Sequence, residues 1–188
     1  MADVSTFYNT IMKNTPLLYK YQFTVELIGS VAGFDNTVDG NVAYWAQSAS
    51  IPAIEVVKAK TAFFGTEFRV PTTVKYEHDW TLKFLLDRDM TIYEKMRTWS
   101  RTFSDLKNSG GGAKTLPDVN MRINLLNPTQ TSVIQSFVLV GCWPTNVGEL
   151  KLEYKQDDTT PMTFDCKIKY QYCYDSTDGT SGDPLATA

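Results

Sequence analysis

The chain has 188 residues, of which 43% are hydrophobic and 13% aromatic, enough for one globular domain with a buried core. Its 18 basic and 21 acidic residues give a net charge of −3, and no basic cluster stands out. This balance argues against a dedicated nucleic-acid-binding protein and against a strongly acidic, disordered chain.

The cysteines and the hydropathy indicate the compartment. The three cysteines are odd in number and form no CxxC motif, so we expect free thiols in a reducing cytoplasm rather than disulfides or a zinc site. No apolar run approaches the ~18 residues of a membrane-spanning helix, and the first residues lack the layout of a secretory signal. We therefore predict synthesis in a cytoplasm and no membrane insertion.

The N-terminal third predicts an arm, a strand and a hairpin. Residues 1–15 contain an amphipathic stretch that is too short to form a stable helix alone, so this arm must dock on another surface. Strict alternation in "YKYQFTVEL" (19–27) predicts a half-buried antiparallel strand. The segment 54–70 predicts two strands joined by a short turn at 61–62, but its alternation is too poor to assign its two faces.

A strand at 79–86 precedes the one convincing helix, 89–103. Apolar side chains on this helix recur at steps of four, three and four and form one packing stripe. The stripe consists of Ile92, Met96, Trp99 and Phe103. Thr91 and Glu94 fit a capping box, with Asp89 as the alternative cap.

The C-terminal half predicts more strands. The segments 149–155 and 162–172 alternate strictly, and a further strand is expected at 119–126. The strand 131–141 is apolar on both faces, so it needs cover from a helix or another subunit on its second side. The tail 175–188 is polar and rich in Gly and Ser.

The sequence offers little for catalysis or ligand binding. His78 is the single histidine, and its neighbour Asp79 points to the opposite face of the strand, so the two make a poor catalytic pair. The paired aspartates at 87–89 and 157–158 lack the spacing of a calcium loop, and "SGGGAK" (109–114) lacks the spacing of a phosphate loop. We predict no catalytic, cofactor or metal site.

The segment "GCWPTNVGEL" (141–150) is unusually specific for a connection between strands. Pro144 holds Trp143 in an extended conformation, while Asn146 and Gly148 are suited to the positive φ that would redirect the chain into strand 149–155. Trp143 is either a core side chain under this turn or a contact with another subunit.

This segment also carries a family resemblance. "GCWPTNVGELKLEY" followed by "MTFDCKIKYQY" closely resembles the C-terminal signature of tail tube proteins from contractile-tailed bacteriophages. The segments "YQFTVELIG", "ASIPAIEVV", "FFGTEFRVP", "YEHDWTLKFLLD" and "YEKMRTWS" resemble other parts of the same family, in order, across most of residues 16–174. The sequence departs from the family pattern in its polar tail and in the insertion 31–41.

The resemblance implies a fold and a function. The fold is a mainly β domain (16–174), an antiparallel β-barrel or sandwich with one flanking helix and a long hairpin, which oligomerises into a ring-shaped continuous barrel. The function is that of a structural virion protein, whose homohexameric rings stack into the inner tail tube that carries phage DNA into the host. The implied partners are the tail sheath protein, the baseplate tube initiator, the tail terminator, and the tape measure protein and genomic DNA inside the lumen.

The candidate oligomer contacts lie in the corner and in the hairpin. They are Trp143, Pro144, Asn146, Gly148, Phe63, Phe64, Gly65 and Phe68. We also expect a neutral-to-acidic lumen, because a basic one would hold DNA through many phosphate contacts. We expect the segments 1–15, 54–70, 108–117 and 175–188 to become ordered on assembly.

Three alternatives remain open at this point. A tube initiator, or the tube of a phage-derived injection particle, would share the fold. A ligand-binding β-barrel of the lipocalin type would be a monomer with an apolar pocket. An enzyme is disfavoured by the single histidine and the lack of a catalytic constellation.

Overall fold

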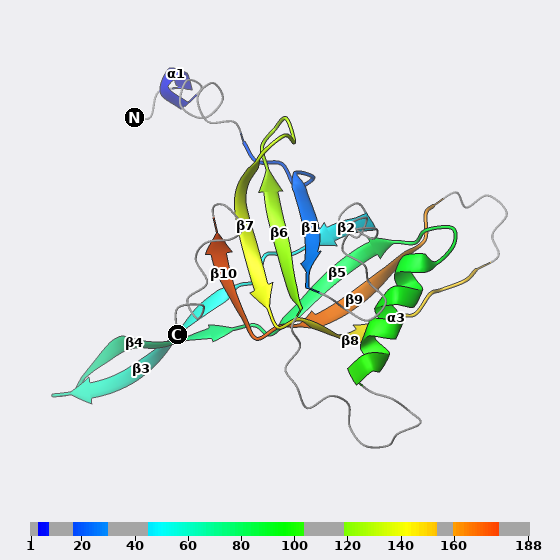
Figure 1. Ribbon diagram of the computed structural model, residues 1–188. Coiled ribbons are helices and arrows are strands. Elements are labelled where there is room, and N and C mark those ends of the chain that lie inside the picture. Colours follow the sequence, from blue (N-terminus) through cyan, green and yellow to red (C-terminus); the bar gives the residue numbers. More distant parts are fainter. Residues whose placement is uncertain (1–3, 8–16, 30–44, 104–118, 154–159, 177–188) are drawn as a thin grey trace.

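The computed structural model describes residues 4–7, 17–29, 45–103, 119–153 and 160–176 (Figure 1). The strands in these residues are β1 (Phe23–Ile28), β2 (Ala46–Ala49), β3 (Ile54–Phe63), β4 (Thr66–Tyr76), β5 (Asp79–Leu85), β6 (Asn120–Leu126), β7 (Val133–Val140), β8 (Trp143–Val147), β9 (Thr163–Lys169) and β10 (Tyr172–Ser176). The helices are α1 (Val4–Phe7) and α3 (Thr91–Phe103). The predicted mainly β fold with a flanking helix and a long hairpin is confirmed.

Two four-stranded antiparallel sheets form the body of the molecule. The first has the order β1-β6-β7-β10 and the second the order β2-β5-β9-β8, while β3 and β4 make a separate two-stranded hairpin. The chain passes from the second sheet to the first between β9 and β10 (Figure 1). For this reason the predicted strand 162–172 is wrong as a single element, because it bends at 170–171 and contributes to both sheets.

The core lies between the two sheets and is built by strict alternation. Alternate residues of the central strands are buried, including Trp80, Leu82 and Phe84 on β5, and their partners on β9 are buried with them. The first sheet contributes a matching set to the same cluster, consisting of Val25, Met121, Ile123 and Leu139. Burying side chains of this size contributes about 1.5–3 kcal/mol each, so the body has a core of its own.

Helix α3 packs against β8 and closes one side of the core (Figure 1). Its residues Ile92, Met96 and Trp99 are buried, and Phe103 is half-buried against the same cluster. Tyr93, which follows Ile92 in the first turn, meets the ring of Phe164 edge-on at 5.2 Å between centroids. The predicted helix is therefore confirmed, with its apolar stripe facing the sheets.

The helix cap differs from both predicted caps. Asp87 Oδ2 accepts a hydrogen bond from Thr91 N at 2.9 Å, and Asp87 Oδ1 accepts one from Ile92 N at 3.4 Å. Met90 takes a left-handed conformation, with φ of 56°, and this brings Asp87 over the first turn. Partial burial opposes ionisation of Asp87, but the hydrogen bonds from Thr91 and Ile92 outweigh it and lower the carboxyl pKa below 3.8.

Two predicted strands are shorter than expected or absent. The segment 19–22 makes a turn instead of a strand, since Gln22 N donates to Tyr19 O at 3.1 Å, and β1 starts only at Phe23. Residues 149–153 are not in a strand. The strand that pairs with this edge of β9 is β8, which lies within the segment 141–150 that was predicted as a connection.

Strand β7 bears out the expectation of cover only in part. Val138 and Leu139, on opposite faces, are both buried, whereas Val133 and Ile134 at the start of the strand are 44% and 52% exposed.

Several segments named in the sequence analysis lie outside the described part of the chain: most of the predicted arm 1–15, the insertion 31–41, the loop 108–117, the aspartates 157–158 and the residues 177–188. No helix in the described part is long and apolar enough to cross a bilayer.

Candidate functional site

The hairpin β3–β4 has little contact with the rest of the described chain. It projects from the body in Figure 1, and its two strands pair with each other and with no other described strand. Large apolar side chains along it are exposed, from 38% at Val57 to 92% at Phe64. An isolated two-stranded hairpin is marginally stable at best in water, so its surface needs a partner outside the part of the chain described here.

Phe64 and Gly65 form a two-residue turn at the tip of the hairpin. Their φ angles are 49° and 76°, and the pair Phe63–Thr66 closes the ladder beside them. Positive φ at both central positions is the geometry of a type I′ turn. The turn predicted at 61–62 is therefore wrong. Phenylalanine rarely adopts this conformation, which costs about 1 kcal/mol.

A bulge at Pro71 reverses the polarity of the hairpin faces. Val56 pairs with Val74, but Lys58 pairs with Pro71, so β4 contains one extra residue between these pairs. Proline lacks the N–H that a ladder uses and is tolerated in a strand at such a bulge. Thr72 sits in the bulge, where its Oγ1 donates to a backbone oxygen of β3 at 2.9 Å.

Beyond the bulge, apolar and charged residues lie on opposite faces. The apolar residues of that outer half form what we call the distal patch: Val57, Ala59, Phe68 and Val70. The charged face opposite consists of Lys58, Lys60, Glu67 and Arg69. Between the body and the bulge, the same face of the hairpin carries apolar side chains in place of the charged ones. We call these residues the proximal patch: Ile54, Val56 and Val74. This exchange explains why the sequence alternation is poor.

Ion pairs organise the charged face. Glu67 Oε1 lies 3.5 Å from Lys60 Nζ and 3.2 Å from Arg69 Nε, and all three side chains are largely exposed. Pairs of this kind contribute little stability. These exposed ion pairs show that the charged face is stable in contact with solvent. The distal patch, on the opposite face, is the side that requires a partner.

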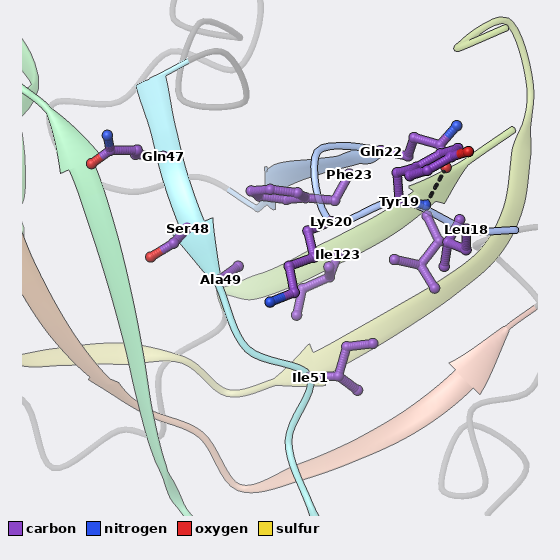
Figure 2. Close-up of a pocket in the computed structure, with 11 residues that line it drawn as sticks. Leu18, Tyr19, Lys20, Gln22, Phe23, Gln47, Ser48, Ala49, Ile51 and Ile123 are labelled. Carbon is purple, nitrogen blue, oxygen red and sulfur yellow. Dashed lines mark hydrogen bonds between the residues drawn. The ribbon is translucent and has the colours of Figure 1, made fainter. Parts of the chain in front are cut away.

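A groove lies between the edge strands β1 and β2 of the two sheets (Figure 2). It encloses about 540 Å³. Most of its walls are apolar and come from three separate segments: Leu18, Phe23, Ala49, Ile51, Ile123 and Leu125. Leu18 and Ile51 are 52% and 47% exposed, and Figure 2 places Leu18, Ile51 and Ile123 around the open space.

Gln22 lines this groove and is incompletely hydrogen-bonded. Its side-chain Oε1 accepts a bond from Tyr19 N at 2.7 Å, and its backbone oxygen accepts one from Leu126 N at 3.0 Å. The residue is 1% exposed, yet Nε2 has no hydrogen-bond partner. A buried donor without an acceptor costs about 1–3 kcal/mol.

The corner residues divide between the two faces of β8. Pro144 pairs with Ile168 and is buried on the core side, whereas Trp143 pairs with Lys169 and is half-buried on the outer face. Trp143 is not part of the hydrophobic core cluster. Asn146 is exposed. The outer face is thus where Trp143 is available for a contact.

Gly148 is explained by a close approach of two strands rather than by a turn. Gly148 N donates to Asp165 O at 2.7 Å, and a Cβ at this position would come within 2.6 Å of the same oxygen. The positive φ predicted for Asn146 and Gly148 is wrong, because the left-handed residue of this corner is Gly141, with φ of 65°.

His78 and Asp79, the two residues weighed as a catalytic pair, make structural contacts with neighbouring strands. His78 Nδ1 donates to Tyr170 O at 3.0 Å, and Asp79 pairs with Lys169 across the sheet at 3.4 Å. The three cysteines are free and buried, and burial raises the pKa of the Cys142 and Cys166 thiols to about 12. Among the described residues, no group of three or more His, Cys, Asp or Glu side chains is placed to hold a metal ion.

The decisive comparison is with a family model. The model for the phage tail tube protein matches residues 6–175. The chain belongs to the phage tail tube protein family. Tail tube proteins are structural, so this one is a component of a phage-type contractile tail and not an enzyme.

Individual relatives agree with this assignment. The tail tube protein gp19 of Enterobacteria phage T4 is 23% identical over 133 residues, which is 70% of this chain and 80% of gp19. Two solved structures share the fold. One, from the sheath-tube complex of an extracellular contractile injection system (PVC) in its extended state, is 13% identical, has a TM-score of 0.57 and covers 94% of this chain and 99% of its own. The other, from the baseplate of the anti-feeding prophage, is 11% identical, has a TM-score of 0.54 and covers 87% of this chain and 97% of its own.

Sequence reasoning found the hairpin of the tail tube protein but missed the groove. The hairpin was visible as an aromatic-Gly segment between two β-rich runs. Gln22 falls within 19–27, which alternation predicts as a half-buried strand, whereas it is buried beside a turn. No local signal reports a groove that three separate segments build.

Proposed function

We propose that this tail tube protein forms homohexameric rings, which stack into the inner tail tube of a phage and give its genomic DNA a passage to the host. The observation that carries the proposal is the hairpin β3–β4, which exposes apolar patches on both faces and packs little against the other described residues. A structure of this kind is completed by other subunits.

The edges of the two sheets support the same proposal. β1 and β10 end one sheet, and β2 and β8 end the other. Exposed edges invite uncontrolled pairing with other chains. Closure of neighbouring subunits into one continuous barrel removes them, so a ring is the state in which this fold has no free edge.

We assign the ring-forming domain to residues 16–174 and its contacts to the corner and the hairpin. Trp143 and Asn146 of the corner are available on the surface, while Pro144 and Gly148 hold the corner in shape. The variant Trp143→Ala separates contact from core. A folded monomer that no longer forms tubes supports the contact role, and an unfolded chain contradicts it.

The proposal assigns partners to each side of the tube. The sheath protein surrounds it, the baseplate tube initiator and the tail terminator bind its two ends, and the tape measure protein and genomic DNA occupy the lumen. The subunit is made in the host cytoplasm and ends in the virion tail. With a net charge of −3, a neutral-to-acidic lumen lets DNA slide. A positive lumen potential in the assembled tube would contradict this.

A second candidate is the tube or tube initiator of a phage-derived injection particle. It is favoured by the likeness of this fold to structures from the PVC and anti-feeding prophage particles. The genes around this one distinguish the two functions. Capsid and packaging genes support the phage tail, and their replacement by toxin-loading genes supports the injection particle.

Electron microscopy of the purified protein tests the main proposal. Negatively stained samples over a range of concentrations are expected to show hollow rings with sixfold symmetry and, at high concentration, stacked tubes. A compact monomer at every concentration would contradict the proposal, and would favour a ligand-binding barrel.

A further inference from the structure

We propose that Tyr170 is a positioning residue for assembly, because its hydrogen bonds fix the direction in which the hairpin β3–β4 leaves the body. This inference rests on the proposed function, since the direction matters where the hairpin meets another subunit. It goes beyond that function by naming what holds the hairpin within its own chain. The hairpin joins the body through two short links, and a buried aromatic side chain donates a hydrogen bond to the backbone of each.

The link between β4 and β5 consists of two residues, Glu77 and His78. The hydroxyl of Tyr170 donates a hydrogen bond to the backbone oxygen of Glu77. Tyr170 N donates to His78 O at 3.3 Å, and His78 Nδ1 donates to Tyr170 O at 3.0 Å. Tyr170 is 1% exposed and belongs to the core cluster. One core residue therefore holds both residues of this link.

The link between β2 and β3 spans residues 50–53 and is held in a similar way. Trp80 Nε1 donates to Ser50 O at 2.6 Å, and Trp80 is also 1% exposed and part of the core cluster. Pro52 fixes one φ angle in the middle of the link. Both links are thus tied to rings of the core, so the core sets the direction of the hairpin.

The length of the hairpin makes its direction sensitive to these links. The hairpin projects from the body in Figure 1, and β4 has 11 residues. At a rise of roughly 3.3 Å per residue, the hairpin is a lever of about 35 Å, and a rotation of about 10° at its base moves the tip by about 6 Å. Side chains lose contact at such a displacement, because contact requires heavy atoms within about 4.5 Å. A contact made by the outer half of the hairpin therefore depends on rigid links.

The phenol of Tyr170 is suited to hold the link without being essential for folding. Burial is the largest cause that raises the pKa of Tyr170 to about 12, and the nearby Cys173 and Glu77 act in the same direction. The hydroxyl therefore keeps its proton at neutral pH and can donate. Glu77 is exposed, so we expect water to replace the donor when the hydroxyl is removed. The loss then falls on the direction of the hairpin more than on stability.

Double electron–electron resonance on the full-length monomer tests the inference. Spin labels at Ala62→Cys and Arg101→Cys report the distance between the hairpin and α3, because both positions are exposed and the native cysteines are buried. Adding Tyr170→Phe is expected to broaden the distance distribution by about 5 Å or more. The matched control is Tyr93→Phe, which removes a phenol that donates to Gly148 O at 3.4 Å within the body. It is expected to leave the distribution unchanged.

Tube formation by the same two phenylalanine variants, without labels, gives a second readout. Tyr170→Phe is expected to raise the concentration needed for assembly by about fivefold or more, because a smaller fraction of hairpins points in the binding direction. Tyr93→Phe is expected to leave this concentration within about twofold. Both variants are expected to keep a cooperative urea transition, with a midpoint within roughly 0.5 M of the wild type. A role in folding alone would not separate assembly from stability in this way.

His78→Ala provides a further variant, at an exposed residue, that removes one hydrogen bond of the link. It is expected to broaden the distance distribution less than Tyr170→Phe does. Unchanged distributions in both variants, or normal assembly of Tyr170→Phe, would overturn the positioning role while the proposed function stands. A wild-type chain that stays monomeric at every concentration would overturn the proposed function and the role in assembly, whereas the distance measurement would still show whether Tyr170 holds the link.

Discussion

The sandwich body and the hairpin obey the same rule of alternation with opposite outcomes. In the body, the apolar face of β5 is buried within the chain, and Trp80, Leu82 and Phe84 are at most 1% exposed. In the hairpin, comparable apolar residues such as Phe68 and Val70 remain about half exposed. Alternation therefore specifies a face that will be buried, but not which molecule buries it.

The largest effect is expected in the body. Phe164→Ala removes a ring that is 2% exposed and stacks on Phe84 at 5.4 Å between centroids. The cavity costs about 3–5 kcal/mol of unfolding free energy, measured by urea denaturation of the monomer. Phe68→Ala, the matched change in the hairpin, is expected to cost less than about 0.5 kcal/mol. Equal losses would break the comparison.

The next effect concerns the strand contact at the corner. Gly148→Ala places a Cβ against Asp165 O, where only 2.6 Å is available. Because backbone must move to relieve the clash, we expect a loss of about 1–3 kcal/mol, measured in the same denaturation assay. Gly65→Ala at the hairpin tip has open space around its Cβ and serves as a control in which only the left-handed φ of 76° is strained.

A smaller effect is expected at the helix cap. Asp87→Asn keeps one acceptor but loses the carboxylate, and Asp87→Ala loses the cap, with an expected cost for the alanine of about 1 kcal/mol. The folded-state pKa of Asp87 is lowered, so its stabilisation is present above the unfolded pKa and is lost as the pH falls through the lower folded value. Denaturation between pH 6 and pH 2 should show this loss in the wild type and not in Asp87→Ala. A parallel loss in both would contradict the cap.

The smallest effect in the monomer is a gain. Phe64→Asn replaces a strained left-handed residue with one that tolerates this conformation at a type I′ turn. We expect hairpin amides to exchange about fivefold more slowly, which corresponds to about 1 kcal/mol of relieved strain. If Phe64 is a contact, tube formation weakens at the same time. Faster exchange together with normal tubes would contradict both assignments.

The sequence predicted the elements whose signals are local. The stripe on α3 and the alternation around Trp80 and Phe164 each required only neighbouring residues and a preference for burial. The tip turn was misplaced because Phe64 adopts a conformation that its side chain disfavours. Strand β8 was read as a connection because Pro144 and Gly148 are rare in strands. An edge position and an irregular register beside Pro144 tolerate the proline.

The candidate site was only half predictable for a different reason. Its hairpin is one continuous segment, but the exchange of polarity at Pro71 depends on the register of two strands. The groove combines residues around 18, 49, 51 and 123, which only the fold brings together. The unfilled hydrogen bond of Gln22 likewise exists only once the turn at 19–22 has formed.

The central claim is that the body buries its apolar face within one chain, whereas the hairpin buries its apolar face only in the assembly. Amide hydrogen exchange, measured on the monomer and on the assembled tube, tests this claim most directly. Slow exchange is expected in β5, β6 and β9 in both states. Fast exchange is expected across 54–76 in the monomer, with strong protection of the same amides in the tube. Equal protection of the hairpin in both states would contradict it.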